Sequence, residues 1–374
     1  MRDCACGRSA KGPSPGLLRN PTPPRKGEGS SALRWCALVA VAAALFITPP
    51  AAAQTQKQPP VALSKTGPVA IDVNARPIVS FDQRDRSHVR FGALQFRSGL
   101  ILTSPYRRFG GLSSLRLDPK GERFIAASDK GTWFTGRIVY RDREMTGLAD
   151  VEAAPMLAAD GRTLAAHNWF DTESMALDGG TIYVGIERVN RIVRFDFGRD
   201  GVRARGEDIA VPPAIRKLPY NRGLEAMVVA PRGGPLAGTL IAISERGLDA
   251  NGNILAFLIG GPSPGSFAVR RHDGFDVSDA AWLPGGDLLL LERKFSLLEG
   301  VGIRIRRIAP DTIVAGATVD GPSIFDADLG QEIDNFEGLD VHVTPEGETV
   351  LTMVSDDNFS MIQRTLLLQF TLVD

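Results

Sequence analysis

Residues 171–188 read DTESMALDGGTIYVGIER, which describes a β-hairpin with charged residues at its open end. Glu173 opens an apolar strand, Asp178-Gly179-Gly180 forms the turn, and the return strand ends on Glu187-Arg188. Apolar runs joined by an Asp-Gly turn are typical of tight hairpins. This hairpin decides the fold because the chain repeats it.

Four further hairpins align with this one on their turns. First strands are expected at 113–117, 173–177, 225–229, 279–283 and 337–341, and second strands at 124–127, 182–186, 240–243, 288–291 and 350–354. Half-buried outer strands are expected at 135–140, 192–197, 254–259, 303–308 and 366–372. Repeats of roughly 40 to 60 residues built from short strands are typical of β-propellers. We therefore predict an all-β propeller whose innermost strands line a central channel.

Strand-like segments also precede the first repeat, at 69–81 and 91–103, the second read as a hairpin around Arg97-Ser98-Gly99. The last repeat shows only three obvious strands, and an open ring leaves an exposed edge strand. We expect an N-terminal strand to complete the last blade and close the ring. The repeats give five blades, and a sixth built from residues 69–108 is the alternative.

The first 53 residues have the features of a secretory signal peptide. Basic residues precede the apolar run CALVAVAAALFI (36–47), which is followed by Ala51-Ala52-Ala53. A basic region, a short apolar region and a small-residue site define such a peptide. Residues 54–66 are expected to form a flexible linker and residues 67–374 the propeller domain. The protein is then periplasmic or secreted, with no later segment apolar enough to span a membrane.

Cleavage changes the composition of the mature chain. All three cysteines (Cys4, Cys6 and Cys36) lie before the expected site, which excludes thiol chemistry and Cys–metal sites afterwards. Residues 1–53 hold seven Lys/Arg and two Asp/Glu, so 36 basic and 41 acidic residues remain. This balance argues against a nucleic-acid partner.

The repeats place charged residues at one mouth of the channel. Nine acids take corresponding positions: Asp129, Glu173, Glu187, Glu225, Glu245, Asp279, Glu292, Glu337 and Asp356. Lys130, Arg188, Arg246 and Arg293 stand beside four of them and are candidates for substrate binding. Because the acids repel one another, they need basic partners or a cation.

Two interpretations of this acidic ring remain open. Oxygen ligands without cysteine favour Ca²⁺ or Mg²⁺ over zinc. The candidate metal ligands are Asp129, Glu173, Glu225, Glu245, Asp279, Glu337 and Asp356, with Glu173, Glu225 and Glu337 also candidates for catalysis. In the other interpretation, the acids hold the blades together through ion pairs and hydrogen bonds.

Other chemistry has less support. His167, in the loop that enters the strand of Glu173, is the best catalytic histidine. Ser113 takes the place of an acid in its repeat, but its surroundings lack the G-x-S-x-G elbow of α/β-hydrolases. No nucleotide-binding fingerprint is present, and we expect neither a nucleotide, nor haem, nor zinc as cofactor.

The repeats resemble a known family. The motifs are FGGLSSLRLD (109–118), DTESMALD (171–178), NRGLEAMVVAP (221–231), VSDAAWLPGGDLLLLERKF (277–295) and NFEGLDVHVTPEGETVLTMVSDDNF (335–359). Together they look like the phytase-like domain described as "esterase-like activity of phytase", over residues 89–373. The resemblance implies an exported bacterial β-propeller and a metal-dependent phosphoester or ester hydrolase, with calcium as the metal.

Two classes of function follow. In the first, the protein hydrolyses a small phosphoester or carboxylic ester at a metal-bearing acidic mouth. In the second, it is a non-catalytic periplasmic propeller that binds a ligand or a protein partner. Propellers host both classes, so the fold does not choose between them.

The signal-peptide pattern predicts that the exported protein begins at Gln54. Expression in a bacterial host, followed by N-terminal sequencing of the periplasmic fraction, measures this directly. A folded, exported protein that retains residues 1–53 would contradict the prediction.

Overall fold

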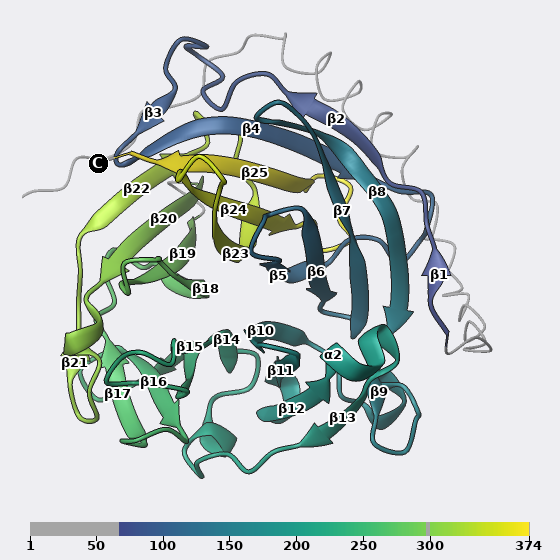
Figure 1. Cartoon of the computed structure of the whole chain (residues 1–374). Coiled ribbons are helices and arrows are strands. Elements are labelled where there is room, and N and C mark those ends of the chain that lie inside the picture. The colour runs from purple at the N-terminus through teal and green to yellow at the C-terminus, as the bar shows by residue number, and fades with distance from the viewer. Residues whose placement is uncertain (1–66, 297–299, 374) are drawn as a thin grey trace, which may run out of the picture. The chain divides into compact units, whose positions relative to one another are not determined.

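The computed structural model describes residues 67–296 and 300–373, which form five β-sheets arranged around a central axis (Figure 1). These residues belong to one compact unit, 63–374. The expected signal peptide and the linker 54–66 lie outside the described residues. The all-β propeller of the sequence prediction is confirmed, and it has five blades.

The innermost strands form a continuous ring. They are β5 (Leu112–Leu117), β10 (Thr172–Asp178), β14 (Leu224–Val229), β18 (Asp276–Trp282) and β23 (Asn335–Val343). Each contacts the next in this order, and β23 contacts β5. The second strands are β6 (Arg123–Ser128), β11 (Thr181–Ile186), β15 (Leu240–Leu248), β19 (Leu288–Ser296) and β24 (Thr349–Asp356). The predicted hairpins are therefore the inner halves of the blades.

Outer strands complete the first four blades. The first blade adds β7 (Thr132–Arg141), β8 (Glu144–Pro155) and β1 (Val69–Ala70). The second adds β12 (Arg191–Asp196), β13 (Arg205–Asp208) and β9 (Leu157–Ala158), and the short helix α2 (Phe197–Asp200) follows β12. The third adds β16 (Ile254–Ile259), β17 (Gly265–Val269) and β21 (Thr318–Val319), and the fourth adds β20 (Gly300–Ile308) and β22 (Ser323–Asp328).

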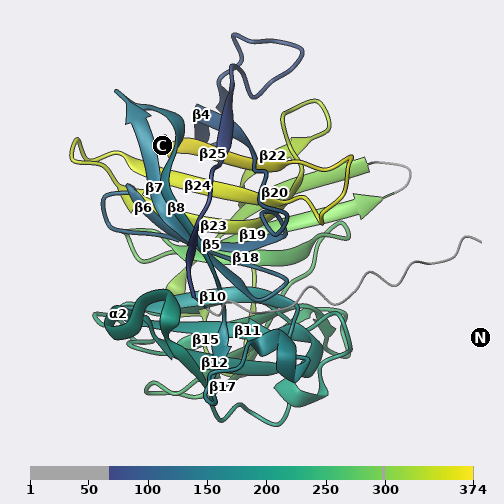
Figure 2. The same ribbon diagram turned by 90° about the vertical axis from the view of Figure 1, so that its right-hand side faces the viewer.

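The fifth blade joins segments from the two ends of the described chain. Its order is β2-β4-β25-β24-β23, where β2 is Asn74–Ile78, β4 is Leu94–Thr103 and β25 is Thr365–Leu372. Short strand β3 (Arg90–Phe91) pairs with β4. The side view shows β4 beside the yellow C-terminal strands (Figure 2). Because residues 69–103 are divided between the first and fifth blades, the alternative of a sixth blade is wrong.

The expected hairpin around Arg97-Ser98-Gly99 is also wrong. Residues 94–103 form one strand, in which Gly99 pairs with Leu368. A Cβ atom at Gly99 would lie 2.7 Å from Leu368 Cδ2. The glycine therefore allows close packing between strands, which sequence reasoning mistook for a turn.

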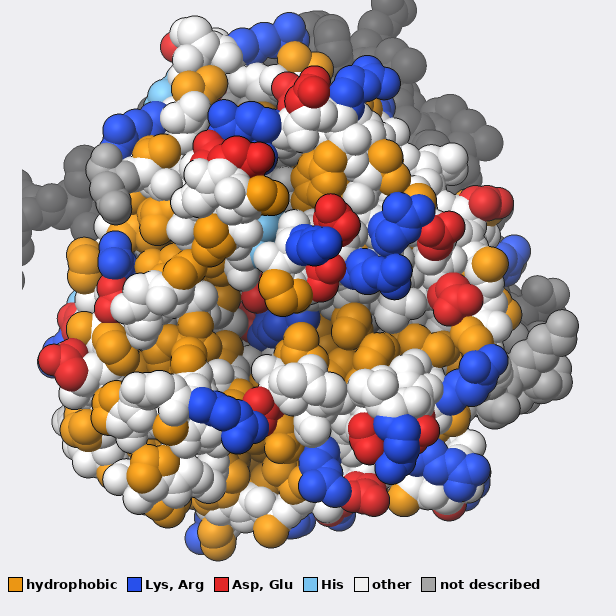
Figure 3. Space-filling view, viewed as in Figure 1, with side chains coloured by type: hydrophobic (Ala, Val, Ile, Leu, Met, Phe, Trp, Pro, Cys, Tyr) orange, Lys and Arg blue, Asp and Glu red, His pale blue; other side chains and the backbone are white. Residues whose placement is uncertain are grey.

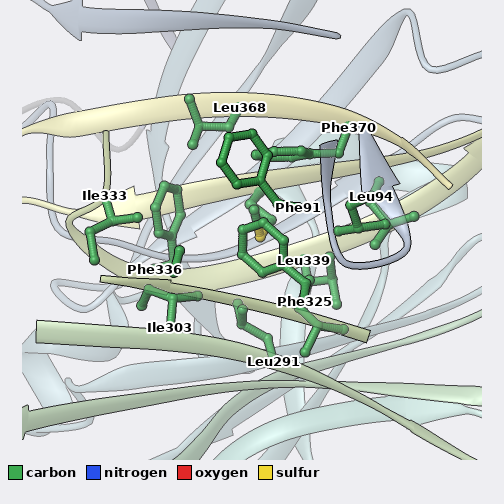
Figure 4. Packing of buried hydrophobic residues seen from close by; sticks show 14 of the residues in the cluster. Phe91, Leu94, Leu291, Ile303, Phe325, Ile333, Phe336, Leu339, Leu368 and Phe370 are labelled. Carbon is green, nitrogen blue, oxygen red and sulfur yellow. The ribbon is translucent and has the colours of Figure 1, made fainter. Parts of the chain in front are cut away.

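Apolar side chains fill the space between neighbouring blades. One cluster joins the fourth blade to the fifth, with Phe325, Phe336 and Phe370 among its buried members (Figure 4). The Phe325 and Phe370 ring centroids lie 5.2 Å apart in an edge-on arrangement. Full burial of such a side chain contributes about 1.5–3 kcal/mol.

The surface mixes charges of both signs. On the face drawn in Figure 3, Lys/Arg and Asp/Glu side chains lie next to one another, and the face is hollowed near its middle. Among the described residues, no helix is long and apolar enough to cross a membrane.

One buried arginine bridges all five innermost strands. Arg116, in β5, donates hydrogen bonds to the main-chain oxygens of Leu115 (2.5 Å), Met227 (3.0 Å), Leu339 (3.0 Å) and Met175. On β18, the two Asp279 oxygens accept from its Nη1 and Nη2 at 2.8 and 2.9 Å. Asp279 also accepts from the main-chain N–H of Leu339 at 2.8 Å. This guanidinium therefore fixes the innermost strands to one another across the axis.

Replacement of Arg116 tests this role. Arg116→Met keeps most of the side-chain volume but leaves the Asp279 carboxylate buried without its partner, and breaking a buried pair in this way costs about 3–5 kcal/mol. Urea denaturation measures the loss, with the exposed Arg203→Met as control. Adding Asp279→Leu to Arg116→Met should recover part of the loss, because no charge is then left unpaired. A loss below about 1 kcal/mol in the single variant would contradict the role.

Candidate functional site

Every innermost strand carries a β-bulge at the same repeat position. The pairing with the second strand shifts at one residue in each blade: Ser113, Glu173, Glu225, Ser278 and Glu337. A bulge re-aims the side chain of its extra residue, and bulges are frequent beside active sites. The fold therefore presents three glutamates and two serines from equivalent positions at one end of the axis.

A second set of equivalent residues follows the second strands. In each blade, the residue just before the bulge pairs with a residue of the second strand, and the residue that follows this partner belongs to the set. The set comprises Asp129, Glu187, Glu245, Arg293 and Asp356. We call the bulge residues and this second set the mouth ring. Four blades supply an acid to the second set, and the fourth blade supplies Arg293.

The structure corrects the sequence alignment in the fourth blade. There the bulge residue is Ser278 rather than Asp279, and the second-set residue is Arg293 rather than Glu292. Asp279 binds Arg116 near the axis, while buried Glu292 pairs with Arg306 of β20. Both acids are thus held away from the mouth ring by ion pairs of their own.

Arg293 is the cation around which several ring acids gather. Its Nη2 lies 2.9 Å from Glu225 Oε1 and 3.6 Å from Glu245 Oε1, and its Nη1 lies 2.9 Å from Glu337 Oε1. Nη1 also donates to Asn335 Oδ1 at 2.5 Å. One arginine therefore balances part of the charge of three carboxylates from the third and fifth blades.

The mouth ring holds more carboxyl groups than the positive charge of Arg293 can balance. Burial, followed by the charges of Glu225 and Glu337, raises the pKa of Glu173 well above its usual value. Burial also raises the pKa values of Glu225 and Glu337, against the effect of Arg293. Burial and then Glu337 raise the pKa of Asp356 to about 8. A pKa of about 8 favours the protonated form of Asp356 at neutral pH.

Glu173 differs from the other ring acids in having no fixed partner. Within residues 67–296 and 300–373, its carboxyl group makes no hydrogen bond and no ion pair, and its side chain is partly exposed. Asp129, by contrast, binds Lys130, although its Oδ1 atom is buried without a partner. A reachable carboxyl group with a strongly raised pKa is suited to transfer protons.

Two other ring acids connect structural elements. Glu187 Oε1 accepts a hydrogen bond from the main-chain N–H of Gly223 at 2.7 Å, which joins the second blade to the strand of Glu225. Burial raises the pKa of Glu187 to about 7. Asp356 Oδ1 accepts from the N–H of Asn358 at 2.6 Å and fixes the following loop.

The arrangement does not fit a metal ion as the sequence analysis expected. No three acid, histidine or cysteine side chains in the described part of the chain are grouped to hold one. Arg293 already binds Glu225, Glu245 and Glu337, and Asp279 is bound to Arg116. Calcium binding by the seven candidate ligands stays a prediction, and the chemistry proposed for the ring is assigned to the protein's own side chains.

The other candidate residues lie around the ring or outside it. Lys130 pairs with Asp129, and Arg188 Nε lies 2.6 Å from Asp171 Oδ2. Arg246 pairs with Asp276 and so connects the third and fourth blades. His167 Nε2 lies 3.1 Å from Asp160 Oδ2 in its own loop, and the His167 ring lies beside Trp169, with the ring centroids 5.7 Å apart.

Sequence reasoning missed Ser278, Asn335, Arg107 and Arg108. Ser278 could have been found only from the bulge, which requires the pairing of the strands. Buried Ser113 was identified, but its hydroxyl donates to the Thr172 oxygen at 2.5 Å, as a structural residue does.

These features define a five-bladed β-propeller with an acidic mouth. The family model "Phytase-like: Esterase-like activity of phytase" matches residues 107–359, more than half of the chain. The chain therefore belongs to the phytase-like family, as the motifs suggested. A comparison with curated proteins finds no match.

Solved propeller structures are similar to this chain at low identity. Glutaminyl cyclase from Myxococcus xanthus is 12% identical with a TM-score of 0.37, covering 71% of this chain and 92% of its own. The PQQ-bound aldose sugar dehydrogenase from Streptomyces coelicolor is 14% identical with a TM-score of 0.36, and the match covers 82% of this chain and 99% of the dehydrogenase.

The raised pKa values predict that the free energy of unfolding falls as pH rises. A group whose pKa is higher in the folded than in the unfolded state stabilises the folded protein at pH values below its unfolded pKa. This stabilisation is lost as the pH rises through the folded pKa. For Asp356 the window runs from about 4 to about 8. Each pKa unit corresponds to about 1.4 kcal/mol, so a loss on the order of a few kcal/mol is expected between pH 5 and 8.5.

Urea denaturation at several pH values measures this fall. Asp356→Asn should flatten it, because asparagine keeps the oxygen that accepts from Asn358 but does not ionise. The exposed Asp311→Asn makes the same charge change and should leave the slope unchanged. A wild-type stability that rises over this range would show that the ring acids are ionised in the folded protein.

Proposed function

We propose that this protein is a hydrolase of a small phosphoester or carboxylic ester, acting at the mouth ring. The observation that carries the proposal is the Glu173 carboxyl group, which is partly exposed, has a raised pKa and makes no hydrogen bond or ion pair with the described part of the chain. Membership of the phytase-like family supports hydrolysis of this kind.

Ester hydrolysis requires an acid for the leaving oxygen and a base for the attacking water. In the proposed step, the water oxygen forms a bond to the carbonyl carbon or phosphorus, and the bond to the leaving oxygen breaks. The Glu173 proton moves to the leaving oxygen. Asp129, the ring acid beside Lys130, accepts the proton that the water releases. Transfer of protons to and from solvent then restores both groups.

Positive charges beside the ring stabilise the negative charge that develops on the reacting group. Lys130 interacts electrostatically with Asp129, Asp171 and Glu173, which puts its ammonium close to the proposed acid. Arg293, which binds Glu225 and Glu337, also interacts electrostatically with Glu173. Fixed charges of this kind stabilise transition states because they need no reorganisation.

We also propose that the protein is exported to the periplasm or secreted. The support is the sequence of residues 1–53, with its basic region, apolar run and alanine site. The mature enzyme then works without cysteines, as expected for a chain that folds without disulfide bonds in an oxidising compartment.

Glu173→Gln tests the catalytic role. The substitution keeps the size of the side chain but removes its transferable proton, so hydrolysis of p-nitrophenyl phosphate or p-nitrophenyl butyrate should fall by about 100- to 10,000-fold. Relief of like-charge repulsion should leave the melting temperature equal to or above that of the wild type. The exposed Glu207→Gln in the second blade serves as control and should keep full activity.

The same assay decides between the two classes of function and tests calcium. Activity that survives EDTA supports the metal-free mechanism, whereas activity lost with EDTA and restored by Ca²⁺ refutes it. If neither ester is hydrolysed by the wild type or by Glu173→Gln, the binding propeller is the better account.

A further inference from the structure

A basic pocket lies beside the mouth ring. Its volume is about 620 Å³, and its lining includes Arg107, Arg108, Lys130, Phe170, Arg188 and Phe359. These residues come from loops of the first, second and fifth blades, next to ring positions Asp129, Glu173, Glu187 and Asp356. Pockets that bind small molecules typically span about 300–1,000 Å³.

The charge of the pocket is only partly balanced by the protein. Arg107 and Arg108 are exposed, and within residues 67–296 and 300–373 neither forms a hydrogen bond or an ion pair through its side chain. Lys130 and Arg188 pair with Asp129 and Asp171 respectively. Four basic side chains therefore surround a space to which the protein brings two acids. Guanidinium groups bind planar carboxylates and phosphates through paired hydrogen bonds.

Aromatic rings hold two of these cations in place. The Arg188 guanidinium lies 4.3 Å from the centroid of the Phe170 ring and 5.5 Å from that of Tyr220. The Lys130 ammonium lies 5.5 Å from the Phe359 ring centroid. Cations are attracted to ring faces, so these contacts orient both charged groups without neutralising them.

The backbone is strained where the pocket walls meet. Phe359 and Asp171 have φ angles of 50° and 61°, in the left-handed region that non-glycine residues rarely adopt. A Cβ atom at Gly111 would lie 2.4 Å from Asp129 Oδ1 and 2.5 Å from Phe359 Cε2. Only glycine at position 111 leaves room for both the Asp129 and the Phe359 side chains. Strain of this kind is concentrated at ligand sites.

We propose that this pocket binds the oxyanion group of the substrate, a phosphate or a carboxylate, beside Glu173. Lys130 connects the pocket to the mouth ring, because it lines the one and binds Asp129 of the other. The main-chain N–H of Asp171 also donates to the main-chain oxygen of Asp129 at 2.8 Å, which fixes the two loops to each other. That the bound oxyanion is part of a substrate rests on the proposed function, whereas binding of the oxyanion itself does not.

Calorimetry with phenyl phosphate and with benzoate tests the pocket without relying on turnover. Arg107→Gln/Arg108→Gln should weaken binding of whichever anion the wild type binds by at least tenfold, and added salt should reduce the difference. The control Arg76→Gln/Arg203→Gln removes two exposed arginines from elsewhere and should bind as the wild type does. The anion bound more tightly identifies phosphate or carboxylate as the preferred group.

The outcomes separate this proposal from the proposed function. Binding that is lost in the Arg107/Arg108 variant but kept in Glu173→Gln supports the pocket, whether or not any ester is hydrolysed. Equal binding by the two double variants overturns it, even if Glu173→Gln abolishes hydrolysis. Failure of the wild type to bind either anion overturns it too.

Discussion

The guanidinium of Arg116 is the interaction on which the propeller depends. Each innermost strand leaves main-chain oxygens facing the axis, where few donors are available. Arg116 satisfies oxygens of four strands and binds Asp279 of the remaining one. Burial raises the pKa of Asp279, although Arg116 and two main-chain N–H groups favour its charged form. An ion pair of this kind gains little free energy over apolar packing, but it is costly to break, so it specifies how the blades are joined.

The mouth ring follows from the same geometry. A bulge in each innermost strand directs one side chain toward the end of the axis, and three of these side chains are glutamates. The second set adds four acids and Arg293. Since Arg293 and Lys130 cannot balance seven acids that are partly removed from water, burial and mutual repulsion raise the pKa values of several of these acids. The chemistry proposed for Glu173 is therefore a consequence of crowding and burial rather than of a special partner.

Much of the fold could be predicted from the sequence, because Asp-Gly and Pro-Gly turns and apolar strands are local features. The strand register of the fourth blade could not be predicted from the sequence. Asp279 follows Ser278 directly, and Glu292 precedes Arg293, so an alignment that looks for acids selects the wrong member of each pair. A bulge is defined by strand pairing and has no signature in the sequence of one strand. Likewise, Arg107 and Arg108 became candidates only when the fold placed their loop beside Lys130 and Phe359.

The proposed chemistry depends on Glu173 being protonated at neutral pH, with no partner for its carboxyl group among the described residues. Infrared difference spectroscopy of wild type against Glu173→Gln, recorded through a pH titration, measures this most directly. The account predicts a protonated-carboxyl carbonyl band that is present at pH 7 in the wild type, missing in the variant, and lost at higher pH. A Glu173 that gives only carboxylate bands at pH 7 and takes up its proton at its ordinary pKa would contradict it.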